Sequence, residues 1–300
     1  MASTFPLLNA PLLVLANISS FWEPQNLITI SLCSKNMYRI LKTYLIKTPA
    51  DWQLGMIDGD IPAASAYYPE TPEHVRLLIA RSTSEMKTDK MKILKVGDHS
   101  VPASYEEGCV VTYWNDEKLG LSTVVDYVST FFNMNVLSLN IVKSGLWTLD
   151  WIRSRQIEPI RRGAVIDRWS EWSEDEMTNL LRNLHPTEFL LISTSAPGKF
   201  GFTETFANSK YIRMTASWIT INNIMRMTAT EIVILGTGIT SWDLNIFLWH
   251  WMRGGSPELE YIHVNVDDLN VFEIFDGLEE DLEEVFEERW YRREWVLKFL

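Results

Sequence analysis

The sequence has little cysteine and little histidine for a chain of 300 residues. Its two cysteines, Cys33 and Cys109, provide neither a disulfide framework nor the ligands of a structural zinc site. Such sparse cysteine is typical of a reducing compartment. We therefore expect an intracellular protein, cytoplasmic or nuclear, and not a secreted one. The histidines have no metal-ligand spacing, so no metal is expected; they are His74, His99, His185, His250 and His263.

Signatures of catalysis are also missing. No G-x-S-x-G nucleophile motif occurs, and neither cysteine stands in a catalytic signature. Asp267 and Asp268 are paired acids, but such pairs are common in acidic loops and do not by themselves indicate acid–base chemistry. The sequence therefore predicts a protein that is not an enzyme and that uses no cofactor.

No apolar run is suited to cross a membrane. Residues 5–22 are apolar and uncharged, but no Lys or Arg precedes them, and Pro6 and Pro11 interrupt them. A membrane-spanning helix needs about 20 consecutive apolar residues, and a signal peptide has a positively charged start. We expect no membrane association. Secretion or anchoring through this stretch is a minor alternative.

Positive charge is scarce in one part of the chain. The formal net charge is −12, and residues 267–288 hold eleven Asp or Glu and no Lys or Arg. The other 28 acidic residues nearly balance the 27 basic ones, so the acidity is local. Because no basic stripe is present to neutralise phosphates, we expect no nucleic acid partner.

The composition that remains is that of a globular protein with an unusually apolar N-terminus. Hydrophobic residues make up 46% of the chain and charged residues 22%, enough for one large domain and a small one. In the first forty residues apolar side chains recur at helical spacing, and Pro11 and Pro24 stand where helices begin. A segment this short cannot bury them on itself. The rest of the chain or a partner must cover them.

These N-terminal residues resemble an F-box, the three-helix module that docks on a Skp-type adaptor of cullin-based ubiquitin ligases. The LPxxLLxxI opening of the family lies over residues 10–18, its PxxL over Pro24 and Leu27, and its closing motif over residues 30–35. Ser-Leu-Cys-Ser-Lys at 31–35 is typical of the nematode F-box expansion. Two positions depart from the pattern, because Ala10 replaces the usual Leu and Leu13 the usual Glu.

The resemblance implies an F-box over residues 1–47 that binds a Skp-type adaptor and, through it, a cullin. Basic residues outnumber acidic ones here, with Lys35, Arg39, Lys42 and Lys47 against Glu23 alone, which suits the acidic adaptor of the family. The residues that the resemblance assigns to adaptor binding are Pro11, Leu12, Val14, Leu15, Ile18, Pro24, Leu27, Leu32, Cys33 and Lys35.

The next part of the chain is less regular. Residues 48–91 are predicted to be a linker and irregular connection, because four prolines interrupt them. Strand-like runs follow at 92–96 and 109–114. Residues 119–132 are predicted to form a helix. Its apolar face consists of Leu121, Val124, Val125, Val128 and Phe132.

From residue 136 the sequence is periodic. Strand-like runs begin near residues 136, 164, 188, 211, 231 and 259, at intervals of 28, 24, 23, 20 and 28 residues, and helix-like stretches follow most of them. Repeats of this length that alternate strand and helix are typical of leucine-rich repeats. The predicted fold class is mixed α/β: a three-helix F-box, then a leucine-rich-repeat-like βα solenoid over residues 92–266, then a C-terminal capping helix.

Residues 216–266 resemble the type-two F-box-associated domain of nematode F-box proteins. The motifs that carry the resemblance are Ser-Trp-Ile-Thr at 217–220, Leu-Asn-Ile-Phe-Leu at 244–248, Trp251 and Pro-Glu-Leu-Glu-Tyr at 257–261. The order of the two modules is also that of the family. The resemblance implies the substrate-recognition subunit of a Skp–cullin–F-box ubiquitin ligase, whose solenoid binds a protein target.

Two motifs offer other interpretations. Trp169-Ser-Glu-Trp172-Ser matches a cytokine-receptor motif, but the sequence lacks the cysteines and dense strand pattern of that β-sandwich. Gly236-Thr-Gly238 follows a strand-like run and precedes a helix, as in a dinucleotide fingerprint, yet lacks the third glycine. A nucleotide-binding α/β enzyme is therefore a lesser alternative, beside an independent repeat scaffold without a ligase role.

Candidates for target binding lie in loops that follow strands, because solenoids bind along their strand face or its rim. They are Thr194, Ser195, Thr237 and Asp267. Residues 267–300 are predicted to form an acidic C-terminal helix that closes the last repeat, with docking of a basic substrate as the alternative. Its apolar face would consist of Leu278, Leu282, Val285 and Phe286.

Overall fold

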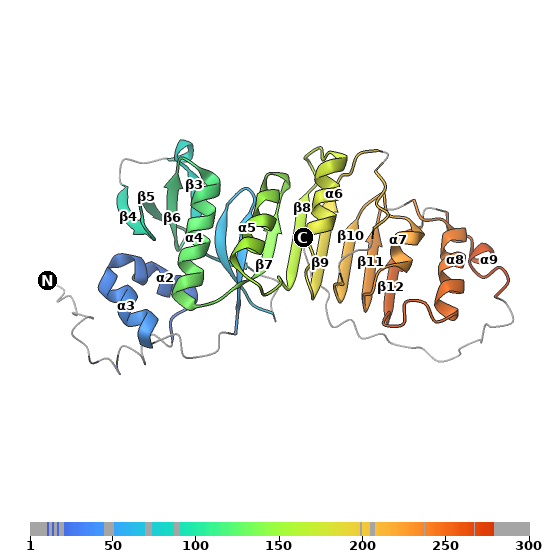
Figure 1. The fold of residues 1–300 in the computed structure, drawn as a ribbon, viewed down its shortest axis with the longest axis horizontal. Helices are drawn as coiled ribbons and strands as arrows, with labels where there is room; N and C mark the ends of the chain where they lie inside the picture. The colour runs from blue at the N-terminus through green and yellow to red at the C-terminus, as the bar shows by residue number, and fades with distance from the viewer. Residues whose placement is uncertain are drawn as a thin grey trace. The chain divides into compact units, whose positions relative to one another are not determined.

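A computed structural model of the chain (Figure 1) describes Pro11, Val14, Asn17 and residues 21–44, 51–69, 74–86, 91–198, 200–204, 208–236, 238–266 and 268–278. The chain divides into two compact units, Met1–Asn140 and Ile141–Leu300. Both contain helices and strands, which confirms the mixed α/β class. Within the described ranges, no helix is both long and apolar enough to cross a membrane.

The first unit combines helices with a mixed sheet. Its helices are α2 (Pro24–Cys33), α3 (Lys35–Tyr44), the 3-10 turn η2 (Thr83–Glu85) and α4 (Glu117–Phe132). Its strands are β1 (Gln53–Asp58), β2 (Ala63–Tyr67), β3 (His74–Ser82), β4 (Lys92–Val96), β5 (His99–Glu106), β6 (Cys109–Trp114) and β7 (Val136–Ile141), which ends on the first residue of the second unit. Their order is β7-β1-β2-β3-β6-β5-β4, with β3 parallel to β6 and antiparallel to β2.

The stretch 48–91, predicted to be a linker and irregular connection, instead contains β1, β2 and β3. All five residues of β2, Ala-Ala-Ser-Ala-Tyr, are buried. Small side chains are needed there, since a Cβ built on Gly55 of β1 would lie 2.5 Å from the hydroxyl oxygen of Ser65. Pro62 directly precedes β2, and Pro69 follows it, so these prolines bound a strand rather than prevent one.

Helix α4 covers β2 and β3 with its apolar face. Asp116 begins the helix, because its carboxylate accepts hydrogen bonds from two main-chain N–H groups of the first turn. The first four predicted face positions are fully buried, but Phe131 completes the face, whereas Phe132 is only half-buried. The helix predicted at 119–132 is therefore confirmed, and its last face position is corrected by one residue.

The second unit is built from parallel strands that lie side by side in chain order. The strands are β8 (Arg162–Asp167), β9 (Phe189–Thr194), β10 (Tyr211–Thr215), β11 (Glu231–Leu235) and β12 (Tyr261–Val264). Its helices are the 3-10 turn η3 (Lys143–Leu146) and α5 (Trp147–Arg155) before β8, α6 (Glu174–Asn183), α7 (Ile221–Met225) and α8 (Ser241–Met252) between the strands, and α9 (Val271–Ile274) after β12. Right-handed crossovers between consecutive parallel strands place the helices on one side of the sheet, as Figure 1 shows for α6 and α7.

The predicted periodicity is confirmed at the level of single strands. β10 and β11 begin at the predicted residues, Tyr211 and Glu231, and the other strands of the second unit begin within two residues of the prediction. Capping boxes start three of the helices, with Ser173 before α6, Thr220 before α7 and Thr240 before α8. The acidic helix predicted at 267–300 lies outside the described residues from position 279 onward.

Candidate partner-binding surfaces

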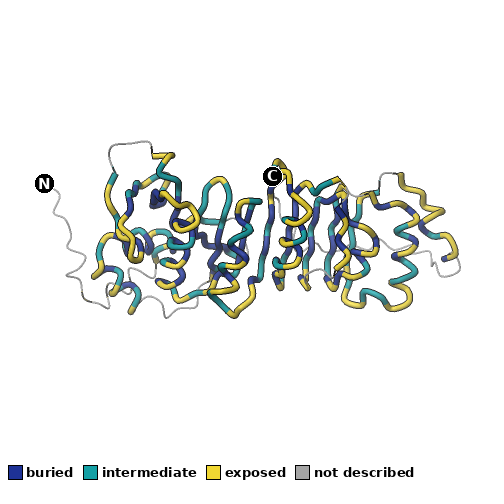
Figure 2. The backbone as a smooth tube through the Cα atoms, turned by 45° about the horizontal axis from the view of Figure 1, so that its top comes forward, coloured by how far each residue is buried: buried dark blue, intermediate teal, exposed yellow. Residues whose placement is uncertain are grey.

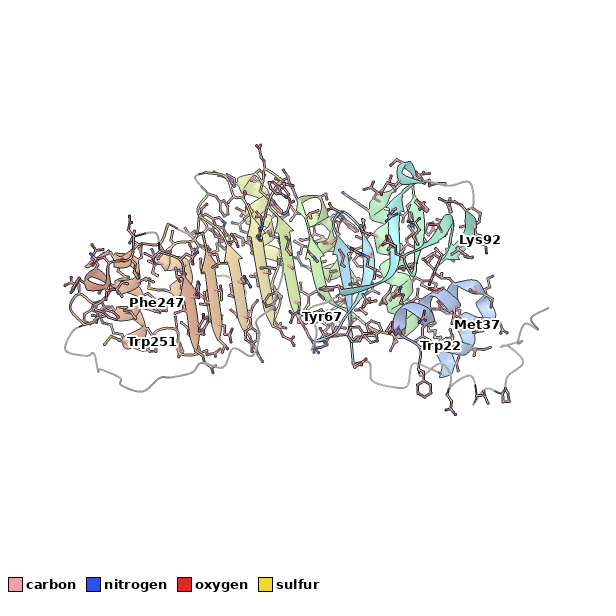
Figure 3. The ribbon with its side chains drawn as sticks, turned by 180° about the vertical axis from the view of Figure 1, so that it is seen from behind. Trp22, Met37, Tyr67, Lys92, Phe247 and Trp251 are labelled. Carbon is pink, nitrogen blue, oxygen red and sulfur yellow. The ribbon has the colours of Figure 1, made fainter. Side chains whose placement is uncertain are left out.

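Helices cover one face of the second unit's sheet. Among the described residues, no helix covers the other face (Figure 1). Along β10 and β11 every second side chain, such as Ile212 and Ile234, is buried toward the helices. The alternating residues of these two strands are half-buried, and the tube in Figure 2 is coloured by this burial. Their side chains point the other way, to the side that faces the viewer in Figure 3. We call this side the open face; it comprises Arg162, Ala164, Ile166, Arg168, Phe189, Leu191, Ser193, Tyr211, Arg213, Thr215, Glu231, Val233, Leu235, Tyr261 and His263.

The strand register arranges the open face in rows. The first row runs Arg162, Phe189, Tyr211, Glu231 and Tyr261 across the five strands. The guanidinium carbon of Arg162 lies 4.7 Å from the ring centroid of Phe189, so this row begins with a cation stacked on an aromatic ring. Aromatic rings and arginine are the side chains most enriched at binding hot spots.

Two further arginines lie over the same face. In the second row Arg213 of β10 stands between Leu191 and Val233 in register. Beyond the end of β8, Arg168 reaches across to β9, where its Nε donates a 2.9 Å hydrogen bond to the hydroxyl of Ser193. That contact explains why Ser193 is only 4% exposed although it lies on the open face.

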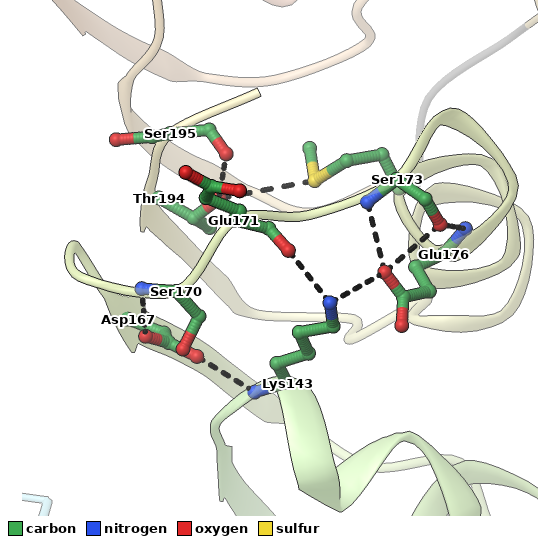
Figure 4. A network of polar contacts seen from close by, with 9 residues as sticks. Lys143, Asp167, Ser170, Glu171, Ser173, Glu176, Thr194 and Ser195 are labelled. Carbon is green, nitrogen blue, oxygen red and sulfur yellow. Dashed lines mark hydrogen bonds and ion pairs between the residues drawn. The ribbon is translucent and has the colours of Figure 1, made fainter. Parts of the chain in front are cut away.

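Within the second unit, a polar network joins the loop at Lys143 to the end of β8 (Figure 4). The main-chain N–H of Lys143 donates to Asp167 at 2.8 Å, and that of Ser170 donates to the same carboxylate at 3.1 Å. Burial alone would raise the pKa of Asp167, but the hydrogen bonds from Ser170 and Lys143 outweigh it and hold the pKa below its usual value. Asp167 is therefore a structural carboxylate that fixes the following loop.

The side chain of Lys143 ties the same loop to the start of α6. Its Nζ donates to the carbonyl of Glu171 at 2.6 Å and lies 3.0 Å from the carboxylate of Glu176. Hydrogen bonds from Ser173 and from Lys143 lower the pKa of Glu176, so the ion pair persists at neutral pH. The loop held in this way presents Trp169, 95% exposed, at the rim of the sheet.

Of the four predicted target-binding residues, the structure describes Thr194 and Ser195. Thr194 is buried on the helix side of β9, and its hydroxyl lies 3.8 Å from the sulfur of Met177. Ser195 is exposed at the rim, where its hydroxyl contacts the carbonyl of Arg168 at 3.5 Å. Thr237 and Asp267 lie outside the described residues. The sequence analysis did not predict the arginines of the open face. The alternation of side chains along each strand is a signal from which they could have been predicted.

The predicted adaptor-binding residues fall into three groups. Pro24, Leu27 and Leu32 of α2 are buried against the chain itself, where α2 packs on α3 and β3. Cys33, Lys35, Pro11 and Val14 are exposed. Leu12, Leu15 and Ile18 lie outside the described residues.

The N-terminus of α8, which follows Gly236 and Gly238 in the chain, is already capped by a carboxylate. Thr240 caps helix α8, and its N–H and hydroxyl both donate to the carboxylate of Asp243, at 2.9 Å and 2.7 Å. A helix N-terminus attracts anions, and here the chain's own carboxylate already fills that role. Among the described residues, no three His, Cys, Asp or Glu side chains are grouped so as to hold a metal ion.

An open groove of about 770 Å³ runs along α8 on the helix side of the unit. Trp242 and Ile246 line it, and Arg253 stacks on Trp249 at 5.0 Å from the ring centroid. Figure 3 shows Phe247 and Trp251 on the same helix; Phe247 is buried in the unit, whereas Trp251 is 51% exposed. The groove therefore lies on a helix that is apolar on most sides.

Comparison with known proteins gives one match. No curated protein and no solved structure matches the chain. Residues 203–264 match the model of a family described as F-box associated. The matched stretch contains β10, α7, β11, α8 and β12, and so includes most of the region that the sequence motifs single out. Residues 203–264 of this chain are an F-box-associated domain, as the resemblance predicts.

Proposed function

We propose that this protein is the substrate-recognition subunit of a Skp–cullin–F-box ubiquitin ligase. The observation that carries the proposal is the F-box-associated match at residues 203–264, which follows an N-terminal segment with F-box spacing. Such a subunit needs no active site, because it acts by holding a target near the ubiquitin-conjugating enzyme and raising its effective concentration. Its place of action would be the cytoplasm or the nucleus.

Adaptor docking is assigned to the N-terminal helices. Leu27 and Leu32 pack inside the first unit and hold α2 in place, while Cys33 and Lys35 present the exposed end of the motif. Val14, 41% exposed, and Pro11 extend this surface toward the N-terminus. An apolar surface edged by basic residues is suited to an acidic adaptor.

Target capture is assigned to the second unit, which we interpret as a short leucine-rich-repeat-like solenoid. Its five parallel strands succeed one another in chain order, and each repeat covers the apolar face of the next. The open face and its rim, with Ser195 and Trp169, are then the surfaces offered to the target.

Co-expression with a Skp-type adaptor, followed by gel filtration, tests the ligase role. We expect a stoichiometric complex that the pair Val14→Asp and Lys35→Glu weakens at least about tenfold, because a charge enters the apolar contact and the basic edge is reversed. Lys118→Glu is the matched control, since Lys118 is also exposed but lies on α4. A folded chain that elutes apart from the adaptor would overturn the proposal.

The alternative is a binding scaffold without a ligase role, in which the N-terminal helices only complete the first unit. The burial of Leu27 and Ile28 against the rest of the chain favours it. In that case the chain binds its partner but never the adaptor, and the double variant behaves like the wild type in every binding assay.

A further inference from the structure

The open face carries positive charge on a chain whose formal net charge is −12. Among its fifteen described side chains, three are arginines, Arg162, Arg168 and Arg213, and a single one is acidic, Glu231. The face is therefore a local exception to the acidic balance of the molecule. Charge of one sign on a surface attracts partners of the other sign and rejects those of its own.

Arg162 and Arg213 are half-buried on the sheet, and Arg168, although exposed, is tied to the sheet by a hydrogen bond. Arg162 stacks on Phe189 at 4.7 Å, and the Nε of Arg168 is bound to Ser193 at 2.9 Å. Arg213 is half-buried between two apolar neighbours in register. Guanidinium groups fixed in this way lose little side-chain entropy when they bind a carboxylate, and they pair in a medium of lower dielectric constant than water.

Apolar surface alternates with these charges. Phe189 and Tyr211 follow Arg162 in the first row, and Tyr261 ends that row on β12. Neighbouring strands lie about 4.8 Å apart, so Arg162 and Arg213, two strands apart, are within reach of one short extended peptide. A peptide that places carboxylates and apolar side chains in turn would meet both kinds of surface.

We propose that the open face binds an acidic, apolar-rich segment of a protein partner, whose carboxylates pair with Arg162, Arg168 and Arg213 and whose apolar side chains pack on Phe189, Tyr211 and Tyr261. The inference rests on the proposed function in naming the class of target that the receptor captures. A basic segment would face three guanidinium groups with one carboxylate to offset them. A nucleic acid would find too few cations for its phosphates.

Fluorescence anisotropy with the full chain tests this assignment. The probes are labelled peptides in which Glu alternates with Leu, and matched peptides in which Gln or Lys replaces every Glu. We expect binding to fall from the Glu to the Gln peptide and to be lost with the Lys peptide. Each of the substitutions Arg162→Gln, Arg168→Gln and Arg213→Gln should weaken binding of the Glu peptide about fivefold, the upper range for a surface ion pair.

Arg253→Gln is the matched control, because Arg253 also stacks on an aromatic ring, at 5.0 Å from Trp249, but on α8. Its substitution should leave peptide binding unchanged. Equal binding of the Glu, Gln and Lys peptides, or an equal loss with Arg253→Gln, would overturn the assignment. The adaptor complex of the triple arginine variant is measured in parallel. Peptide binding without any adaptor complex would defeat the ligase role and leave this assignment standing.

Discussion

The main-chain N–H of Lys143 donates a 2.8 Å hydrogen bond to the carboxylate of Asp167, which lies 24 residues further along the chain. The bond joins the loop after β7 to the end of β8, and Ser170 donates to the same carboxylate. A single buried carboxylate therefore fixes the first loops of the rim.

Asp167→Asn should destabilise the protein by about 2 kcal/mol at neutral pH. The amide group places an N–H₂ against one of two main-chain donors, and hydrogen bonds to a charged acceptor contribute about 1.5–3 kcal/mol. Urea unfolding at pH 7, followed by circular dichroism, measures the difference in the free energy of unfolding. If the variant were as stable as the wild type, the hydrogen bonds to Asp167 would not stabilise the rim.

The difference in stability between the wild type and Asp167→Asn should depend on pH. The folded-state pKa of Asp167 is lowered, so its stabilisation is present above the unfolded pKa of about 3.9 and is lost as the pH falls through the lower folded value. The stability difference between wild type and Asp167→Asn should therefore be constant from pH 7 down to about 5 and shrink below pH 4. A difference that grew on acidification would contradict this sign.

Prediction from the sequence succeeds for the second unit because its repeat has one simple rule. In β8, β10 and β11 buried residues stand at alternate positions, and α6, α7 and α8 each follow a capping residue. Each strand from β9 to β12 pairs with its immediate predecessor. The same alternation places Thr194 on the side of Leu190 and Ile192, which is the helix side. Because Thr194 stands at the end of a strand-like run, its position predicts a loop residue. Counting in steps of two from Leu190 instead predicts a core residue.

The first unit and the open face depend on contacts between distant residues. β2 has small residues without alternation, and only its position between β1 and β3 makes it a strand. Arg162 and Arg213 share a face because two intervening registers align β8, β9 and β10. No local pattern fixes those registers, so the arginine group becomes visible only in the assembled sheet.

The motif Trp-Ser-Glu-Trp-Ser supplies a prediction with an internal control. Trp172 is 4% exposed, whereas Trp169 is 95% exposed. Trp172→Ala should cost about 3–5 kcal/mol of stability, the usual range for a buried aromatic side chain, and Trp169→Ala less than about 0.5 kcal/mol. Thermal unfolding of the two variants compares them directly. Similar losses would mean that Trp169 is covered in solution.

Gly120→Ala in α4 should destabilise the first unit, although alanine normally stabilises a helix interior by about 1 kcal/mol relative to glycine. A Cβ at this position would lie 2.6 Å from the indole of Trp114, which is itself buried. Displacing that ring should cost about 1–3 kcal/mol, as other overpacked cores do. The urea concentration at the midpoint of unfolding shows whether the substitution lowers or raises stability. A higher midpoint would show that the indole of Trp114 moves aside freely.

Substitutions of Leu27 are expected to affect the stability of the first unit, whatever their effect on adaptor docking. The side chain of Leu27 is 8% exposed and lies on α2 beside Ile28, which is fully buried against the chain. Leu27→Ala should therefore destabilise the protein by about 2–4 kcal/mol, and Leu27→Asp should unfold the first unit, because it would bury a carboxylate without a partner. Loss of adaptor binding by either variant would not identify a docking residue.

The informative comparison uses Lys35, which is exposed on α3 next to Cys33. Lys35→Glu should leave the free energy of unfolding within about 0.5 kcal/mol of the wild type, as is usual for surface positions, yet weaken the complex with an acidic adaptor. Urea unfolding and gel filtration on the same preparations separate the two effects. Weaker docking in Lys35→Glu with full stability would place the adaptor on this edge of the helices, whereas unchanged docking would move the adaptor surface away from α3.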